Sequence, residues 1–123
     1  MAKNFSPSAE DYLETVYILS LKDDKPKSID VATALNVSRP AVNIAMNKLI
    51  ELGFVNKEAY SKIELTPKGL ALAKFTYDKH KAIEKFLINL GVSEKTASID
   101  CCKIEHAISP ETYNIIKKYN DEH

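Results

Sequence analysis

Residues 28–53 read SIDVATALNVSRPAVNIAMNKLIELG, a pattern that predicts two short helices joined by a tight turn. Ser28 is expected to cap the first helix, and Asn36 suits the left-handed residue that ends a helix. Ser38 is expected to cap the second helix, with Pro40 in its first turn, where the missing N–H of proline costs little. Two helices joined in this way have the form of a helix-turn-helix.

The second helix of this pair is expected to have one buried and one polar face before it ends at Gly53. Its buried stripe is predicted to comprise Val42, Met46, Leu49 and Ile50. Arg39, Asn43 and Asn47 then share the exposed face at four-residue spacing. In the major groove of DNA, Arg can bind guanine and Asn can bind adenine through two hydrogen bonds each. A solvated face in a helical protein is the alternative interpretation.

Two short strands are predicted directly after the helix pair, at 54–58 and 62–65, around a turn at Ala59-Tyr60-Ser61. A hairpin in this place gives the layout of a winged helix. Lys57 and Lys62 in the hairpin are expected to hold phosphates, which position a protein on DNA without reading its sequence. The residues predicted to contact double-stranded DNA are Ser38, Arg39, Pro40, Asn43, Asn47, Lys57 and Lys62.

Helical signals dominate the rest of the chain, and the first of them is a capping box at Ser8-Ala9-Glu10-Asp11. The predicted helices run from Ala9 to about Leu21, from Thr66-Pro67 to about Leu90, from Ser93 to about Ala107, and from Ser109-Pro110-Glu111 onward. The buried stripe of the long helix is predicted to comprise Leu70, Ala73, Tyr77, His80, Ile83, Leu87 and Leu90. The fold class is therefore mainly α: a winged helix-turn-helix with a small β-hairpin wing over 1–66, followed by a helical unit over 67–123.

The overall composition is that of a folded protein, and its 123 residues carry no net charge. Basic residues exceed acidic ones within 25–68, where phosphates are expected to bind, and acidic residues exceed basic ones within 1–24. No apolar run approaches the length of a membrane span, and the N-terminus lacks the apolar region of a secretion signal, so a cytoplasmic location is expected.

A group of potential metal ligands lies near the end of the chain, in Cys102-Lys103-Ile104-Glu105-His106. Residues three and four apart share a face of a helix, so Cys102, Glu105 and His106 would offer sulfur, oxygen and nitrogen to one cation. Cys101 belongs to the core stripe of the same helix and is expected to pack inward. The two adjacent cysteines are predicted to be free thiols, because neighbours on a helix point about 100° apart.

Asp11 and Glu14 form a second pair of this kind on the first helix, and His80 lies on the buried side of the long helix. Each of these residues also has a simpler interpretation. Asp11 can close its capping box, Glu14 can be a surface charge, and a single histidine is usually a satisfied core residue. Cys102 can be a small core residue, and the carboxylate and imidazole that follow it can be solvated. Six residues of metal-ligand type on three helices nevertheless favour a metal site.

Taken together, these segments resemble the DtxR/MntR family of metal-dependent transcriptional repressors, over about Ser8 to Tyr119. The resemblance lies in Glu10-Asp11-Tyr12-Leu13-Glu14, in the helix-turn-helix around Ile29 to Gly53, in Leu65-Thr66-Pro67-Lys68-Gly69, in His80, and in Cys102-Lys103-Ile104-Glu105-His106-Ala107-Ile108-Ser109. It implies that the helical unit serves dimerisation and metal binding. It also implies that bound metal fixes the two DNA-binding domains of a homodimer in the arrangement that fits a palindromic operator. The family's ligand positions fall on Asp11, Glu14, His80, Cys102, Glu105 and His106.

The resemblance also implies the class of metal. The activating ion is expected to be Fe²⁺ or Mn²⁺, with Co²⁺, Ni²⁺ or Zn²⁺ able to bind in vitro, and the regulated genes those of metal homeostasis. The chain resembles the short, two-domain form, without the SH3-like domain of the iron branch. Cys102 resembles the iron branch and Asp11 the manganese branch, so the site is a hybrid. Ile44 occupies a recognition-helix position that is often polar in the family.

Two other function classes compete with a metal-gated repressor. A winged-helix regulator that is not gated by metal would bind its operator equally well without it. A metalloenzyme would need an open metal position to activate water. The sequence shows no separate nucleophile, acid–base pair or glycine-rich phosphate loop, so the chain is not expected to be an enzyme.

Overall fold

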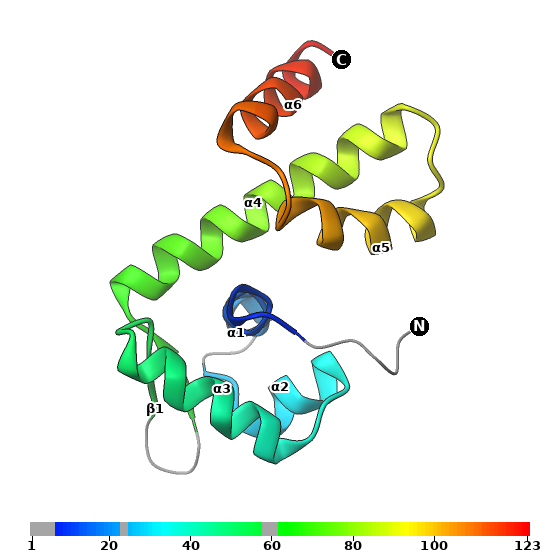
Figure 1. Cartoon of the computed structure of the whole chain (residues 1–123). Coiled ribbons are helices and arrows are strands. Elements are labelled where there is room, and N and C mark those ends of the chain that lie inside the picture. Colours follow the sequence, from blue (N-terminus) through cyan, green and yellow to red (C-terminus); the bar gives the residue numbers. More distant parts are fainter. Residues whose placement is uncertain (1–6, 23–24, 58–61) are drawn as a thin grey trace. The chain divides into compact units, whose positions relative to one another are not determined.

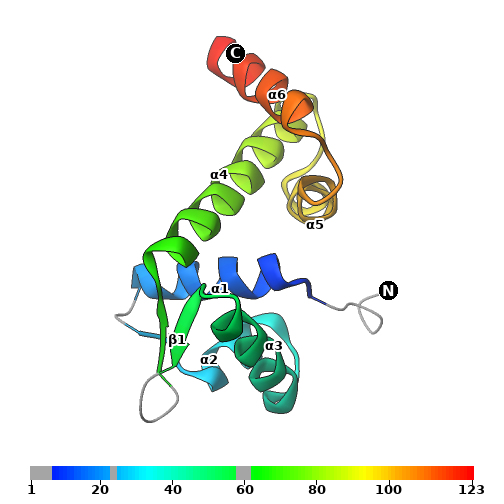
Figure 2. The same cartoon turned by 60° about the vertical axis from the view of Figure 1, so that its left-hand side comes forward.

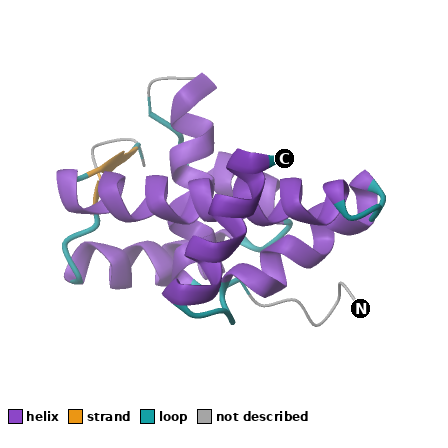
Figure 3. Cartoon of the chain, turned by 90° about the horizontal axis from the view of Figure 1, so that it is seen from above, coloured by secondary structure: helices purple, strands orange, loops and turns teal. Residues whose placement is uncertain are grey.

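Six helices and one two-stranded hairpin make up residues 7–22, 25–57 and 62–123, which are the residues described by the computed structural model (Figure 1). Colouring by secondary structure shows how far helices outweigh the hairpin (Figure 3). The predicted fold class, a mainly α chain with a winged helix-turn-helix, is confirmed. None of the helices in these ranges is long and apolar enough to cross a membrane.

The chain divides into two compact units, Met1–Lys74 and Phe75–His123. The first contains α1 (Ala9–Lys22), α2 (Ser28–Leu35), α3 (Arg39–Glu51), β1 (Val55–Lys57) and β2 (Ile63–Leu65). The long helix α4 (Pro67–Asn89) begins in the first unit and continues into the second, which also contains α5 (Glu94–Glu105) and α6 (Pro110–Glu122).

The turn between α2 and α3 has the predicted local structure. Asn36 adopts a left-handed conformation with φ 55°, and its N–H donates to the last carbonyls of α2. The Ser38 hydroxyl accepts a hydrogen bond of 3.2 Å from the N–H of Ala41, and Pro40 lies in the first turn. The Ser28 cap is wrong, however, because Ser28 is the first helical residue and is buried. The N-cap is Lys27, whose N–H donates to the Asp30 carboxylate at 2.8 Å.

The core of the first unit is one hydrophobic cluster that joins its three helices to the hairpin. Its buried members are Tyr12, Leu13, Val16, Val31, Ala32, Val42, Met46, Leu49, Val55, Ile63 and Ala73. Three of the four residues predicted for the buried stripe of α3 are among them. Ile50 is not, since it is exposed. It follows Leu49 directly, and a step of about 100° around the helix turns it away from the core.

The hairpin lies beside α3, as Figures 1 and 2 both show. Its strands are antiparallel with Val55 opposite Leu65, and both are shorter than predicted. Lys62 forms an isolated bridge with Lys27, and the Ile63 N–H donates to the Pro26 carbonyl at 2.8 Å, so the segment before α2 also pairs with the hairpin. The predicted turn at 59–61 lies outside the described residues, as do the strand residue Glu58 and the helix breaker at Asp23-Asp24.

The backbone at the start of α4 closely approaches the segment that follows α3, at Gly69. A Cβ atom at this position would lie 1.9 Å from the Phe54 carbonyl oxygen, so only glycine fits. Thr66 strengthens the junction, because its hydroxyl donates to the Gly53 carbonyl at 2.6 Å and accepts from the Gly69 N–H at 3.1 Å. The Lys68 ammonium donates to the Leu52 carbonyl at 3.0 Å.

The second unit packs three helical segments around Ile83, Cys101 and Ile116, with Phe86, Leu87, Cys102, Ile104 and Ile108 against them. The predicted starts of α5 and α6 are confirmed, and the hydroxyls of Ser93 and Ser109 cap the two helices by accepting from the N–H groups three residues on. The Asn120 amide donates to the Ala82 carbonyl at 2.8 Å and ties α6 to α4.

The predicted buried stripe of α4 is only partly right. Ala73 and Ile83 are buried, and Tyr77, His80 and Leu87 are partly buried, but the two residues at the ends of the stripe, Leu70 and Leu90, are exposed. The prediction therefore holds only for the middle of this helix of 23 residues.

Candidate metal centre and nucleic-acid face

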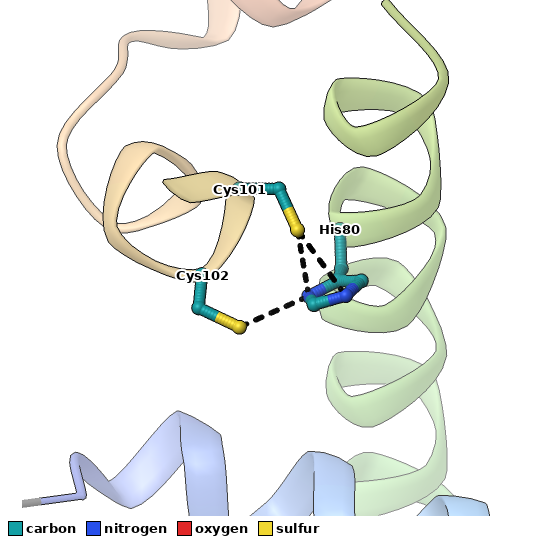
Figure 4. A group of neighbouring side chains, drawn as sticks. All are labelled: His80, Cys101 and Cys102. Atoms are coloured by element: carbon teal, nitrogen blue, oxygen red, sulfur yellow. Dashed lines mark hydrogen bonds between the residues drawn. The ribbon is translucent and has the colours of Figure 1, made fainter. Parts of the chain in front are cut away.

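His80 on α4 faces two sulfur atoms of α5 within the second unit (Figure 4). Cys101 Sγ lies 3.3 Å from His80 Nε2 and 3.7 Å from Nδ1, and Cys102 Sγ lies 3.6 Å from Nδ1. Both cysteines are free thiols, as predicted, with Cys101 buried and Cys102 partly exposed. The residue predicted as core and the residue predicted as ligand thus both lie close to Nδ1 of one imidazole.

Glu105 closes α5, and its side chain is fully buried. Its Oε1 atom lies 3.5 Å from His80 Nδ1 and 3.6 Å from His106 Nε2. These separations are long for hydrogen bonds, and neither carboxylate oxygen has a hydrogen-bond partner among the described residues. A buried carboxylate without donors is unfavourable unless a cation compensates it. The orphaned oxygens of Glu105, with two imidazoles beside them, therefore fit a metal ligand.

His106 follows α5 as its C-cap residue, yet its backbone stays in the right-handed helical region, with φ −87° and ψ −6°. His106 therefore continues the helical geometry of α5 by one residue, so it can share a face with Cys102 and Glu105 as expected. Within the second unit the structure brings these three residues and His80 into one group through the distances given above. The donor set is one sulfur, two carboxylate oxygens and two imidazoles, which suits a divalent transition metal.

The surroundings of the Cys101 thiol disfavour its ionised form. Burial, and after it the nearby thiol of Cys102 and the carboxylates of Glu84 and Glu105, which oppose a negative charge there, together raise the pKa of Cys101 to about 12. Cys101 is accordingly a neutral thiol near pH 7 in the absence of a cation. A coordinating cation reverses this preference, since a metal-bound thiol is deprotonated.

Asp11 and Glu14 lie one turn apart on α1, in the first unit. The Ser8 N–H donates to Asp11 Oδ2 at 2.9 Å, and the Asp11 N–H donates to Ser8 Oγ at 3.2 Å, so the predicted capping box is present. Glu14 is buried, which its interpretation as a surface charge did not anticipate. Ligation of a metal by these two carboxylates stays a prediction.

Sequence reasoning missed the contact between Cys101 and His80. It assigned Cys101 to the core, which the full burial of this residue confirms, but it did not place the thiol against the imidazole. A signal was available, since both residues belong to the predicted buried stripes of their helices. Two helices that pack through those stripes bring such residues together.

The polar face of α3 is exposed in the first unit. Arg39, Asn43 and Asn47 are all exposed, at the predicted four-residue spacing. Pro40 is exposed beside them, and Ile44 leaves 73% of its surface open, which is unusual for a large apolar residue. The face could therefore combine polar groups for base edges with apolar groups for thymine methyls.

Lys57 is the last residue of β1, and Lys62 directly precedes β2. The Lys57 ammonium donates to the Asn43 Oδ1 atom at 3.2 Å, which places a positive charge against the polar face of α3. Lys62 is exposed. The contact occupies the Asn43 Oδ1 atom as an acceptor.

Comparison with known families gives two matches that together span nearly the whole chain. Residues 4–63 match the family described as iron dependent repressor, N-terminal DNA binding domain. Residues 66–122 match the family described as iron dependent repressor, metal binding and dimerisation domain. The two matches meet close to the start of α4.

Individual relatives agree with these families. An HTH-type transcriptional regulator of Methanocaldococcus jannaschii is 44% identical over 119 residues, which cover 95% of both chains. The transcriptional regulator MntR of Salmonella typhimurium is 32% identical over 114 residues, 93% of this chain and 73% of the relative. The structure of the manganese regulator SloR superposes with a TM-score of 0.84 at 33% identity, covering 95% of this chain. This chain spans only 55% of the length of SloR.

Proposed function

This chain belongs to the iron-dependent repressor family of metal-dependent transcriptional regulators, and we propose that a divalent metal ion held by the second unit switches it onto a palindromic operator as a homodimer. The observation that carries the proposal is Glu105. Its fully buried carboxylate has no hydrogen-bond donor among the described residues and lies 3.5–3.6 Å from two imidazoles, and a bound cation would offset the cost of burying it.

His80, Cys102, Glu105 and His106 are the proposed ligands within the second unit. The positive charge of the bound ion would compensate the negative charge of the buried Glu105 carboxylate. Asp11 and Glu14 are proposed as further ligands on the strength of the family resemblance, with Asp11 serving its capping box as well. His80 and His106 supply neutral imidazole nitrogens, and the thiol of Cys102 binds as a thiolate.

The donor set favours Fe²⁺ over Mn²⁺ as the activating ion. The carboxylates and His80 suit either ion, but a thiolate is a softer ligand that binds Fe²⁺, Co²⁺ or Zn²⁺ better than Mn²⁺. The general order of affinities also places Mn²⁺ below Fe²⁺. Co²⁺, Ni²⁺ and Zn²⁺ are therefore expected to bind in vitro. The similar protein SloR is named as a manganese regulator. The preference for Fe²⁺ over Mn²⁺ in this chain therefore depends on Cys102.

The proposed DNA contacts divide into reading and positioning groups. Arg39, Asn43 and Asn47 read base edges in the major groove. Lys57 and Lys62 hold phosphates from the hairpin. Ser38 and Pro40, which begin α3, bring its N-terminal end to the DNA backbone and to the first bases, as helix N-termini commonly do.

The two matched families suggest a division of labour at about Thr66. Residues 1–66 bind DNA, and residues 67–123 dimerise and bind metal. The exposed apolar residues Leu90, Ile99 and Ile115 of the second unit are available for a second copy of the chain. Because the operator is chromosomal DNA, the proposed location is the cytoplasm, and the regulated genes are those of metal homeostasis. The family consists of transcription regulators, so the chain is not an enzyme.

The proposal is tested by selecting DNA fragments from a genomic library in the presence of Fe²⁺ without oxygen. Enrichment of an inverted repeat bound by two chains is expected. The bound fragment is then titrated with Fe²⁺ and Mn²⁺ against the chain and its Cys102→Glu variant. The unmodified chain should respond at lower free Fe²⁺ than free Mn²⁺, and the variant should shift toward Mn²⁺. Activation of the unmodified chain at lower free Mn²⁺ would overturn the assignment of iron.

A further inference from the structure

Cys101 has a reactive group that the proposed function does not use. Its thiol is buried on the stripe of α5 that packs against α4, and its Sγ atom lies within 3.7 Å of both nitrogens of His80. A core position on its own requires only a small apolar side chain. The thiol is instead directed at an imidazole that already faces a second thiol, that of Cys102 (Figure 4).

We propose that His80, Cys101 and Cys102 form a thiol-rich metal subsite for a soft d¹⁰ cation such as Zn²⁺ or Cd²⁺, separate from the Glu105–His106 side of the group. The ligand atoms of these three residues lie within 4.8 Å of one another. All three residues belong to the second unit, so the subsite is complete within one compact part of one chain.

The distances match those imposed by a single tetrahedral ion. With Zn–S bonds of about 2.3 Å and Zn–N bonds of about 2.0–2.1 Å, a sulfur and a nitrogen on one ion lie about 3.6 Å apart. His80 Nδ1 lies 3.7 Å from Cys101 Sγ and 3.6 Å from Cys102 Sγ. The three atoms therefore need little movement to accept an ion between them, and a water molecule can fill the fourth position.

The chemistry of the donors selects the class of ion. Two thiolates and one imidazole form a soft set, which favours Zn²⁺ or Cd²⁺ over Mn²⁺. Binding requires both thiols to release their protons to solvent, as metal-bound thiols do. Cys101 and Cys102 are adjacent on a helix and therefore poorly placed for a disulfide. Their side chains, about 100° apart around the helix, can still coordinate one ion that lies between them.

His80 links this subsite to the proposed regulatory metal. Its Nδ1 atom faces both thiols and also lies 3.5 Å from Glu105 Oε1. One nitrogen lone pair binds one ion, so an ion held by the two thiols withdraws His80, together with Cys102, from Glu105 and His106. If the proposed function holds, on which this consequence rests, a soft ion at Cys101 competes with the activating ion.

The test measures how many thiolates bind each ion. The full-length chain is titrated with Cd²⁺ without oxygen, and the ultraviolet thiolate-to-Cd²⁺ charge-transfer absorbance is recorded per bound ion. The unmodified chain should show about twice the absorbance of Cys101→Ala or Cys102→Ala, and the double variant should show none. Loss of a direct ligand should also weaken Cd²⁺ binding by at least about tenfold.

Two controls separate ligation from packing. Ile116→Val removes one methylene from the core cluster that contains Cys101, and it should retain the full absorbance. Stabilisation of the chain by Mn²⁺ should be the same in Cys101→Ala as in the unmodified chain, which also shows that the variant is folded.

Full absorbance and unchanged Cd²⁺ affinity in Cys101→Ala would overturn the proposal and leave the thiol with only a weak hydrogen bond to His80. The absorbance involves no DNA, so a failure of metal-gated operator binding would leave this result unaffected.

Discussion

Replacing Glu105 by methionine should make the chain more stable without metal and less stable with it. The Glu105 side chain is fully buried, and neither of its carboxylate oxygens has a hydrogen-bond partner among the described residues. Its interactions with His80 and His106, at 3.5 and 3.6 Å, only partly offset the loss of water. Methionine has a similar length and no such requirement, so the substitution removes an unfavourable group from the metal-free protein.

The magnitude follows from the environment of the carboxylate. A buried polar group without partners costs about 1–3 kcal/mol, and more if it is charged. Replacing a buried ionic group by a packed apolar one is neutral or stabilising by about 1–4 kcal/mol. With chelator present, the free energy of unfolding of Glu105→Met should therefore equal that of the unmodified chain or exceed it by about 1–3 kcal/mol. At a metal concentration 100 times the dissociation constant, the unmodified chain should gain about 2.7 kcal/mol, whereas the variant should gain almost nothing.

Denaturant unfolding of both proteins, with chelator and with Mn²⁺, measures all four values at one protein concentration. Glu84→Met is the matched control, because Glu84 lies near Cys101 and pairs with Lys81 at 3.6 Å but is not a proposed ligand. This control should keep the full response to metal. If Glu105→Met instead loses stability with chelator and still responds to Mn²⁺, Glu105 has a structural role, and the metal site lies elsewhere.

Three further substitutions test the fold and the DNA face. Gly69→Ala places a Cβ atom 1.9 Å from the Phe54 carbonyl oxygen, so denaturant unfolding should show a loss of about 1–3 kcal/mol, and a loss below the error of the measurement would contradict the close approach. Arg39→Ala and Asn43→Ala should each weaken operator binding by about 1–3 kcal/mol in anisotropy titrations if each makes a bidentate base contact; intact sequence preference in both would show that another face reads the DNA. Lys62→Ala should weaken operator and random DNA alike and reduce the salt dependence of binding by about one unit, and an effect confined to the operator would contradict a phosphate contact.

Local signals were sufficient to predict the helix-turn-helix. Ser38, Asn36 and Pro40 each act within a few residues along the chain, and the structure has them in their expected places. The errors arose where a residue's role depends on neighbours that lie far away in sequence. Ser28 has the chemistry of a cap, but the pairing of Lys27 with Lys62 starts α2 one residue earlier than expected.

In the candidate metal centre, too, local spacing was predictable from the sequence, whereas contacts between residues far apart in sequence were not. The spacing of Cys102, Glu105 and His106 predicts a shared face, because it depends on helix geometry alone. Helix spacing could not show that His80 faces both cysteines, because that contact depends on how α4 and α5 pack. Nor could helix spacing show that Glu105 is buried with no hydrogen-bond donor among the residues that the structure describes, since burial depends on tertiary packing.

The most direct test of metal gating is the affinity of the chain for its selected operator, measured by fluorescence anisotropy without oxygen, once with chelator and once with saturating Fe²⁺. Moving a switch from about 1:99 to about 99:1 requires a difference of about 5.5 kcal/mol between its two states. Metal should therefore tighten operator binding strongly in the unmodified chain and leave binding by Glu105→Met unchanged. Equal operator affinity with chelator and with metal would contradict the account and leave the chain a winged-helix regulator that is not gated by metal.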